Sequence, residues 1–180
     1  ESLIYAYSAA FPDLEKITIW ARNTEKAKIL INKISNLDIT IEVSSDIQLT
    51  SANADIISTA TMAHEPILKG EWVKPGTHID LIGAFTSDMR EADDFLMSSG
   101  SIFVDSRATT IEHIGELTIP ISNGIISKND IIGDFYDLIP SSKSGRKSND
   151  EITIFKNGGG AHLDLMIAKY LIEISNNSIS

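Results

Sequence analysis

The chain contains no cysteine, and this absence removes several kinds of chemistry. Disulfide bonds, thiolate nucleophiles and zinc sites built on cysteine are all excluded. No stretch approaches the roughly 20 apolar residues that a bilayer-spanning helix needs. No basic segment followed by an apolar run opens the chain either. These absences predict a soluble, cytoplasmic protein with no membrane partner.

The chain also has fewer basic than acidic side chains. The 180 residues include 15 Lys and Arg against 25 Asp and Glu, so the formal net charge is −10 at pH 7. Nucleic-acid binding depends on a surplus of positive charge facing the phosphates, so nucleic acid is not an expected partner. The four histidines do not have the spacing of metal-binding motifs, so we predict no metal site.

Short β-branched or apolar segments alternate with amphipathic segments along the whole chain. Strands are predicted at 16–21, 39–43, 55–60, 78–83, 101–105 and 151–155. Helices are predicted at 1–11, 24–34, 47–53, 90–97, 108–114, 128–138 and 161–174. Parallel neighbouring strands need crossover helices. The order therefore predicts an α/β fold, a doubly wound parallel sheet forming one domain over residues 1–180.

The first predicted helix, 1–11, has no strand or turn before it, and Glu1 is not a start methionine. We therefore expect the fold to be truncated at its N-terminus, as part of a longer protein.

Candidate ligand-binding residues follow the predicted strands, because open α/β sheets bind ligands at the carboxyl ends of their strands. Arg22 and Asn23 follow the first strand, where a dinucleotide fold holds the adenosine ribose or its 2′-phosphate. A solvated arginine at a helix start is the common alternative. Small residues at later strand ends let a flat ligand approach the backbone, or simply mark the change from strand to loop: Thr59, Ala60, Thr61, Met62, Gly83 and Ala84.

A run of glycines, Gly158 to Gly160, follows Asn157 and precedes the last predicted helix. Such a run weakens the fold unless a group must approach the helix N-terminus, where free N–H groups favour anions or carbonyl oxygens. A flexible loop is the alternative interpretation. His162 lies in the first turn of that helix, and it either faces a ligand or is structural.

The remaining motifs are less specific. The acidic residues Glu91, Asp93 and Asp94 are interpreted as the solvated first turn of the helix at 90–97. His78, near a strand start, is interpreted as structural. The sequence has no G-x-S-x-G elbow, no P-loop and no G-x-G-x-x-G motif.

Several segments occur together in an order that resembles the ornithine cyclodeaminase/μ-crystallin family. They are I-W-A-R-N at 19–23, E-P-I-L-K-G-E-W-V-K-P-G at 65–76, G-A at 83–84 with R-E at 90–91 and D-D at 93–94, V-D-S at 104–106, and I-T-I-F-K at 152–156. The resemblance covers nearly all 180 residues. It implies an NAD(P)-binding Rossmann-like domain. It also implies that the first, central strand, the glycine-rich loop and an N-terminal dimerisation and substrate domain are missing from this sequence.

The resemblance implies an NAD(P)H-dependent oxidoreductase, with NADP(H) preferred because of Arg22 and NAD(H) possible. Cyclodeaminases of the family have an Asp where this chain has Phe85, which cannot exchange a proton, so the sequence is more similar to the imine-reducing members. The implied cofactor-binding residues are Arg22, Asn23, Thr59, Ala60, Thr61, Met62, Gly83, Ala84, Asn157, Gly158 and Gly159.

The expected reaction is reduction of a small cyclic imino acid such as Δ1-pyrroline-2-carboxylate to L-proline. The alternatives are an ornithine cyclodeaminase that forms proline and ammonia, a non-catalytic NADP-binding protein like the crystallins of the family, and an alanine dehydrogenase. No catalytic residue is identified, and we expect the proton donor and the partner of the substrate carboxylate to lie upstream of Glu1. The expected protein partners are this missing N-terminal portion and a second copy in a homodimer.

Overall fold

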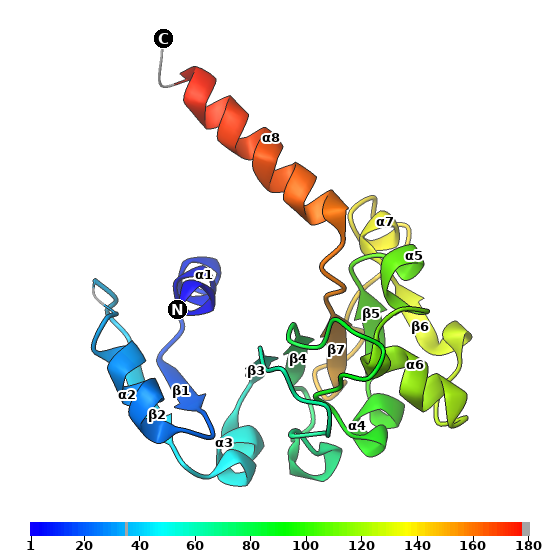
Figure 1. Cartoon of the computed structure of the whole chain (residues 1–180), viewed down its shortest axis with the longest axis horizontal. Helices are drawn as coiled ribbons and strands as arrows, with labels where there is room; N and C mark the ends of the chain where they lie inside the picture. The colour runs from blue at the N-terminus through cyan, green and yellow to red at the C-terminus, as the bar shows by residue number, and fades with distance from the viewer. Residues whose placement is uncertain (35, 178–180) are drawn as a thin grey trace. The chain divides into compact units, whose positions relative to one another are not determined.

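The computed structural model describes residues 1–34 and 36–177, which fall into two compact units, residues 1–53 and residues 54 onward. Figure 1 labels the elements of both units. All pairings between the strands described are parallel, so the predicted α/β fold with parallel strands is confirmed. One domain over residues 1–180 stays a prediction. No helix in the described ranges is long and apolar enough to cross a membrane.

The first unit holds a two-stranded sheet and three helices. Its elements are α1 (Ser2–Ala10), β1 (Lys16–Trp20), α2 (Thr24–Ile31), β2 (Thr40–Ser44) and α3 (Ile47–Asn53). The side chain of Asn23 caps α2 by accepting the backbone N–H of Lys26 at 3.1 Å. This cap agrees with the predicted helix start, although α2 ends at Ile31 rather than 34.

The second unit is built on a five-stranded parallel sheet in the order β3-β4-β7-β5-β6. Its strands are β3 (Ile56–Thr59), β4 (His78–Leu81), β5 (Ser101–Val104), β6 (Ile131–Gly133) and β7 (Thr153–Lys156). Its helices are η1 (Gly70–Trp72), α4 (Asp94–Ser99), α5 (Arg107–Thr110), α6 (Gly115–Ser122), η2 (Lys128–Asp130), α7 (Phe135–Leu138) and α8 (Ala161–Asn177).

The last strand of the chain lies in the middle of this sheet, as Figure 1 shows for β7. Ile154 of β7 pairs with Ile79 of β4 on one side and Ile102 of β5 on the other. All three side chains are buried in the hydrophobic core, with Leu96 and Leu117 from α4 and α6. Apolar burial of this kind is the main stabilising contribution to a sheet covered by helices.

The predicted helix at 128–138 is wrong, because η2, β6 and α7 occupy that segment. Ile131–Gly133 pairs with β5, and a three-residue strand is too short to show an alternating pattern. The side chain of Asp134 then accepts the N–H groups of Tyr136 and Asp137, which starts α7 afresh. Helix α6 was not predicted either. Its first residue, Gly115, donates its N–H to the Thr86 carbonyl at 2.8 Å instead of continuing α5.

The predicted helix at 90–97 begins later, at α4, with Asp93 as its N-cap. The side chain of Asp93 accepts the N–H of Leu96 at 2.8 Å, which fixes the helix start. Ala92, before the cap, forms a parallel bridge with Leu68. Glu91 therefore lies before the helix, and the interpretation of its side chain as part of a solvated helix turn is wrong. It is fully buried.

Candidate functional site

The carboxyl ends of four neighbouring strands meet at one edge of the second unit's sheet. Thr59 of β3 pairs with Leu81 of β4, Leu81 with Lys156 of β7, and Lys156 with Val104 of β5. The loops that follow these strands therefore leave from one edge, which we call the carboxyl edge. It brings together all predicted cofactor-binding residues of this unit: Thr59, Ala60, Thr61, Met62, Gly83, Ala84, Asn157, Gly158 and Gly159. Arg22 and Asn23 follow β1 in the first unit, where Arg22 is exposed.

A buried carboxylate that the sequence reasoning missed joins the loops after β3 and β4. Glu91 accepts the hydroxyl of Thr59 at 2.8 Å, and both the N–H and the hydroxyl of Thr61 at 2.7 Å. It also accepts the N–H of Gly83 at 2.8 Å. Four hydrogen bonds from the two loops converge on this one side chain, so Glu91 fixes both loops. We call this arrangement the Glu91 knot.

A second buried carboxylate supports the segment that carries Glu91. The two oxygens of Glu116 accept the backbone N–H groups of Glu91 and Ala92 at 2.8 and 2.9 Å. Burial raises the pKa of Glu116 to about 7, against the opposing effect of those two N–H groups and of the Lys156 charge. Glu116 therefore changes its charge near neutral pH.

Lys156, the last residue of β7, is buried beneath the carboxyl edge. Its ammonium group donates to the Leu81 carbonyl at 2.9 Å. Burial lowers the pKa of Lys156, and the nearby carboxylates of Glu116, Glu91 and Asp105 oppose that shift. The lysine is thus a positive charge set among buried acids, and its ammonium is bonded to the backbone.

Two apolar side chains at this edge are open to solvent. Met62 is 68% exposed and Phe85 58% exposed, while Ala84 between the loops is fully buried. Gly83 lies so close to Thr61 that a Cβ atom would collide with the Thr61 backbone. The sequence left open whether Gly83 lets a ligand approach or only marks the change from strand to loop. In the structure the neighbouring loop requires a glycine there.

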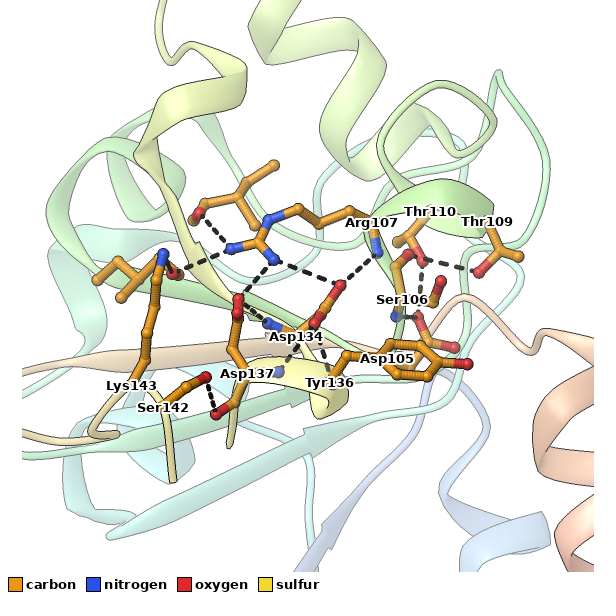
Figure 2. Close-up of polar contacts among 12 residues, drawn as sticks. Asp105, Ser106, Arg107, Thr109, Thr110, Asp134, Tyr136, Asp137, Ser142 and Lys143 are labelled. Atoms are coloured by element: carbon orange, nitrogen blue, oxygen red, sulfur yellow. Dashed lines mark hydrogen bonds and ion pairs between the residues drawn. The ribbon is translucent and has the colours of Figure 1, made fainter. Parts of the chain in front are cut away.

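The other end of the carboxyl edge, after β5, is less completely bonded. Oδ1 of the buried Asp105 accepts the N–H of Ser106 at 2.8 Å and the Thr110 hydroxyl at 2.6 Å (Figure 2). Within the described part of the chain, Oδ2 of Asp105 has no hydrogen-bond partner. Nε2 of His162, in the first turn of α8, lies 3.9 Å from it and also has none.

The glycine run has local contacts of its own. Asn157 donates its N–H to the Leu81 carbonyl at 3.1 Å, and its side chain accepts the N–H of Gly159 at 2.7 Å. A Cβ on Gly158 would collide with the Thr110 hydroxyl, and Gly159 has a φ of +67°, which favours glycine. The run therefore packs closely against α5 instead of forming an open loop.

An arginine clamp holds the start of α5 in place beside Asp105. Figure 2 shows the guanidinium of Arg107 between Asp137, at 2.5 Å, and Asp134, at 3.3 Å. It also donates to the carbonyl of Ile132 at 3.1 Å. The Arg107 guanidinium holds the pKa of Asp137 below its usual range. Asp105 therefore projects from a segment that is fixed to β6 and α7.

A sequence model of the ornithine cyclodeaminase/mu-crystallin family matches residues 1–178. The chain belongs to this family. Among curated relatives, it is 51% identical over 173 residues to Δ1-pyrroline-2-carboxylate reductase of Paracoccus denitrificans. That match covers 96% of this chain and 55% of the relative, so the chain spans about half the length of this relative.

Solved structures of the family have the same fold. Δ1-pyrroline-2-carboxylate reductase of Thermococcus litoralis, solved with NADH and L-proline, superposes with a TM-score of 0.82 at 30% identity, over 87% of this chain and 48% of that one. An archaeal alanine dehydrogenase dimer with bound NAD superposes with a TM-score of 0.87 at 30% identity, over 97% of this chain and 54% of that one.

Proposed function

We propose that the full-length protein is an NAD(P)H-dependent reductase that converts a cyclic imino acid such as Δ1-pyrroline-2-carboxylate into L-proline. The observation that carries this proposal is the 51% identity to a Δ1-pyrroline-2-carboxylate reductase over 96% of the chain. The Thermococcus litoralis structure with NADH and L-proline supports the same substrate and cofactor classes. Phe85 argues against cyclodeamination, since its ring cannot exchange a proton with ornithine.

The carboxyl edge fits a dinucleotide cofactor. Open α/β sheets bind such ligands at this edge. The exposed Met62 and Phe85 offer apolar surface to flat rings, and the Glu91 knot holds the loops between them in one conformation. We infer that Thr61, Met62 and Asn157 contact the cofactor, whereas Ala84 is fully buried. When bound, the reduced nicotinamide supplies a hydride to the imine carbon.

The activity test uses the full-length protein with Δ1-pyrroline-2-carboxylate and NADPH or NADH. We expect NAD(P)H oxidation that depends on the imine and yields L-proline. Ammonia release from ornithine without imine-dependent oxidation would instead identify a cyclodeaminase. NADH oxidation that depends on pyruvate and ammonia would identify an alanine dehydrogenase. A bound-cofactor fluorescence signal with no turnover of any of these substrates would identify a non-catalytic binder.

We further propose that Arg22 makes the protein prefer NADPH. A charge-assisted contact to the 2′-phosphate contributes about 1.5–3 kcal/mol, which corresponds to roughly a ten- to hundredfold preference. Arg22→Ala should raise KM for NADPH by that factor and leave KM for NADH nearly unchanged. Lys26→Ala removes an exposed positive charge from the adjacent helix and serves as the control. An equal rise for both cofactors would show that Arg22 does not bind the phosphate.

We also propose that the full-length protein is a homodimer and that its N-terminal portion covers α8. The archaeal relative is a dimer. Exposed apolar side chains cover α8 on several faces, and a helix that is apolar all round is ordinarily buried: Leu165, Met166, Ile167, Tyr170, Leu171 and Ile172. Light scattering of the full-length protein should give twice the monomer mass.

A further inference from the structure

Two buried polar atoms face each other at the β5 end of the carboxyl edge. Oδ2 of Asp105 and Nε2 of His162 lie 3.9 Å apart, and neither forms a hydrogen bond to any residue that the structure describes. The Asp105 side chain is fully buried, whereas His162 is 23% exposed. A buried carboxylate oxygen without a donor costs free energy, so this atom has a strong tendency to accept a hydrogen bond.

The imidazole of His162 is the donor best placed to bond Asp105. A hydrogen bond needs an N···O distance of about 2.7–3.2 Å, so the ring has to move by about 1 Å. Asp105 itself is held by Ser106 and Thr110, whereas Nε2 of His162 has no hydrogen bond to a described residue that would hold the ring in place. The movement therefore belongs to the histidine.

The two ring nitrogens of His162 have different surroundings. Nε2 is the buried nitrogen, so the exposed part of the ring belongs to its other atoms. Nδ1 lies on the side of Gly160, where a Cβ atom would come within 2.6 Å of it. Acids orient catalytic histidines by accepting one ring N–H and leaving the other nitrogen for the proton transfer. Here the acid faces Nε2, so Nδ1 is the nitrogen left for the reaction.

We infer that Asp105 and His162 form a carboxylate–imidazole dyad in which His162 donates the proton for imine reduction. This inference rests on the proposed function, because it assigns a proton donor to that reaction. His162 is the catalytic residue, and Asp105 is a positioning residue that fixes its orientation and tautomer. The sequence alone does not indicate this donor, because the two residues lie far apart in the chain and share no motif. The proposed dyad replaces the expectation of a donor upstream of Glu1.

The proton and electron balance of the step is simple. The N–H bond at Nδ1 of the His162 imidazolium breaks, and an N–H bond forms at the imine nitrogen. The imine carbon receives a hydride, with its two electrons, from the reduced nicotinamide, so the C=N double bond becomes a C–N single bond. His162 is left neutral with its proton on Nε2, the tautomer that bonds Asp105, and it recovers a proton from water.

The other histidines do not have this arrangement. His64 is exposed and faces Asp88 on the surface, and His113 is exposed. Nδ1 of His78 is bonded to the Thr153 hydroxyl at 2.8 Å, and burial lowers the pKa of His78. Among the described histidines, His162 alone combines a buried acid on one nitrogen with a position at the carboxyl edge.

The first test compares variants of the full-length enzyme. We expect His162→Asn to lower kcat for imine reduction by about 10²–10⁴-fold, the usual contribution of a general acid. We expect its NADPH dissociation constant, measured by fluorescence, to stay within about twofold of the wild-type value. His113→Asn removes an exposed histidine and serves as the control. A His162→Asn enzyme with wild-type kcat would overturn the dyad.

The second test is independent of turnover and measures the tautomer of His162 by ¹⁵N NMR of the full-length protein, at a pH where the ring is neutral. We expect the Nε2–H form in the wild type. In Asp105→Asn the amide N–H₂ replaces the unpartnered oxygen and forces Nε2 to accept, so the Nδ1–H form should dominate and kcat should fall by at least about tenfold. Asp164→Asn, an exposed acid on α8, serves as the control.

Together, the two tests distinguish failure of the dyad proposal from failure of the proposed function. If the wild type does not reduce the imine, the proposed function fails, and the tautomer measurement still decides whether Asp105 orients His162. If the wild type reduces the imine but Asp105→Asn leaves the tautomer unchanged, the dyad is overturned and the reductase activity stands.

Discussion

The two ends of the carboxyl edge use buried carboxylates in opposite ways. Both oxygens of Glu91 are engaged by donors from the loops after β3 and β4. Asp105, after β5, uses only Oδ1 and leaves Oδ2 without a partner in the described chain. A fully bonded acid stabilises the structure and has no capacity for a further donor. An acid with one free oxygen retains that capacity, at a cost in stability.

This difference indicates that the two carboxylates at the carboxyl edge have different roles, one structural and one chemical. The Glu91 knot fixes the shape of the surface that we assign to the cofactor. At the other end, Oδ2 of Asp105 is a buried carboxylate oxygen with no donor among the described residues, unlike either oxygen of Glu91. Unsatisfied buried groups in native structures call for an explanation of this kind, because most of them are paired.

The largest expected effect comes from removing the acid at the centre of the knot. Glu91→Ala leaves the donors of the buried Thr59 and the half-buried Thr61 and Gly83 without their acceptor, so we expect the free energy of unfolding to fall by about 3–5 kcal/mol. Urea denaturation of the full-length protein measures this loss. Glu71→Ala, which removes an exposed acid, should change the unfolding free energy by no more than about 0.5 kcal/mol. A loss below 1 kcal/mol for Glu91→Ala would contradict the scaffold role.

The next effect is a pH dependence of the free energy of unfolding, which Glu116 causes by titrating in the folded protein. Burial raises the pKa of Glu116 from 4.5 to about 7 in the folded protein. Between these values the folded state keeps a proton that the unfolded state has lost, so stability falls as pH rises through this window. The loss between pH 5 and pH 8 should be of the order of 2–3 kcal/mol.

The matched variant for this prediction is Glu116→Gln, which cannot titrate. Urea denaturation at pH 5, 6, 7 and 8 should show that the stability of the wild type relative to Glu116→Gln falls steadily with pH. Parallel curves for the two proteins would mean that Glu116 is ionised in the folded protein over this whole pH range. The positive charge of the buried Lys156 would then stabilise the ionised form.

Much of the fold could be predicted from the sequence, because periodic apolar segments report the strands and their order. The strand ends could be predicted too, since chain order alone places Thr59 and Gly83 at the ends of strands and Asn157 after one. The Glu91 knot could not, because a Glu before two Asp residues has the composition of a solvated helix start. Its burial comes from tertiary contacts, among them the pairing of Ala92 with Leu68.

The arrangement around Asp105 could not be predicted from the sequence for a different reason. β6 has three residues, too few for an alternating pattern, so the Arg107 clamp across β6 and α7 left no local sequence signal. The glycine run did indicate that a close approach occurs. It did not indicate that α5 is the neighbour.

A smaller effect is expected from filling the space between α5 and the glycine run. In Gly158→Ala the new methyl group collides with the Thr110 hydroxyl, which is a case of overpacking that costs about 1–3 kcal/mol. Gly145→Ala, where a Cβ meets no atom within 4 Å, is the control. Thermal unfolding should show a lower Tm for Gly158→Ala and an unchanged Tm for the control. Equal Tm values would mean that the run does not pack against α5 in solution.

The smallest expected effect concerns the side chain of Asn157, which is part of the run that leads to His162. It accepts the Gly159 N–H at 2.7 Å, and such a bond contributes about 0.5–1.5 kcal/mol. Asn157→Ala should therefore lower Tm by only a few degrees and increase the hydrogen exchange rate of the Gly159 amide by roughly three- to tenfold. Asn157→Asp keeps an acceptor and should keep the slow exchange rate. If Asn157→Ala exchanges at the wild-type rate, this hydrogen bond does not hold the run, and the restraint on the backbone before His162 comes from the packing of Gly158 alone.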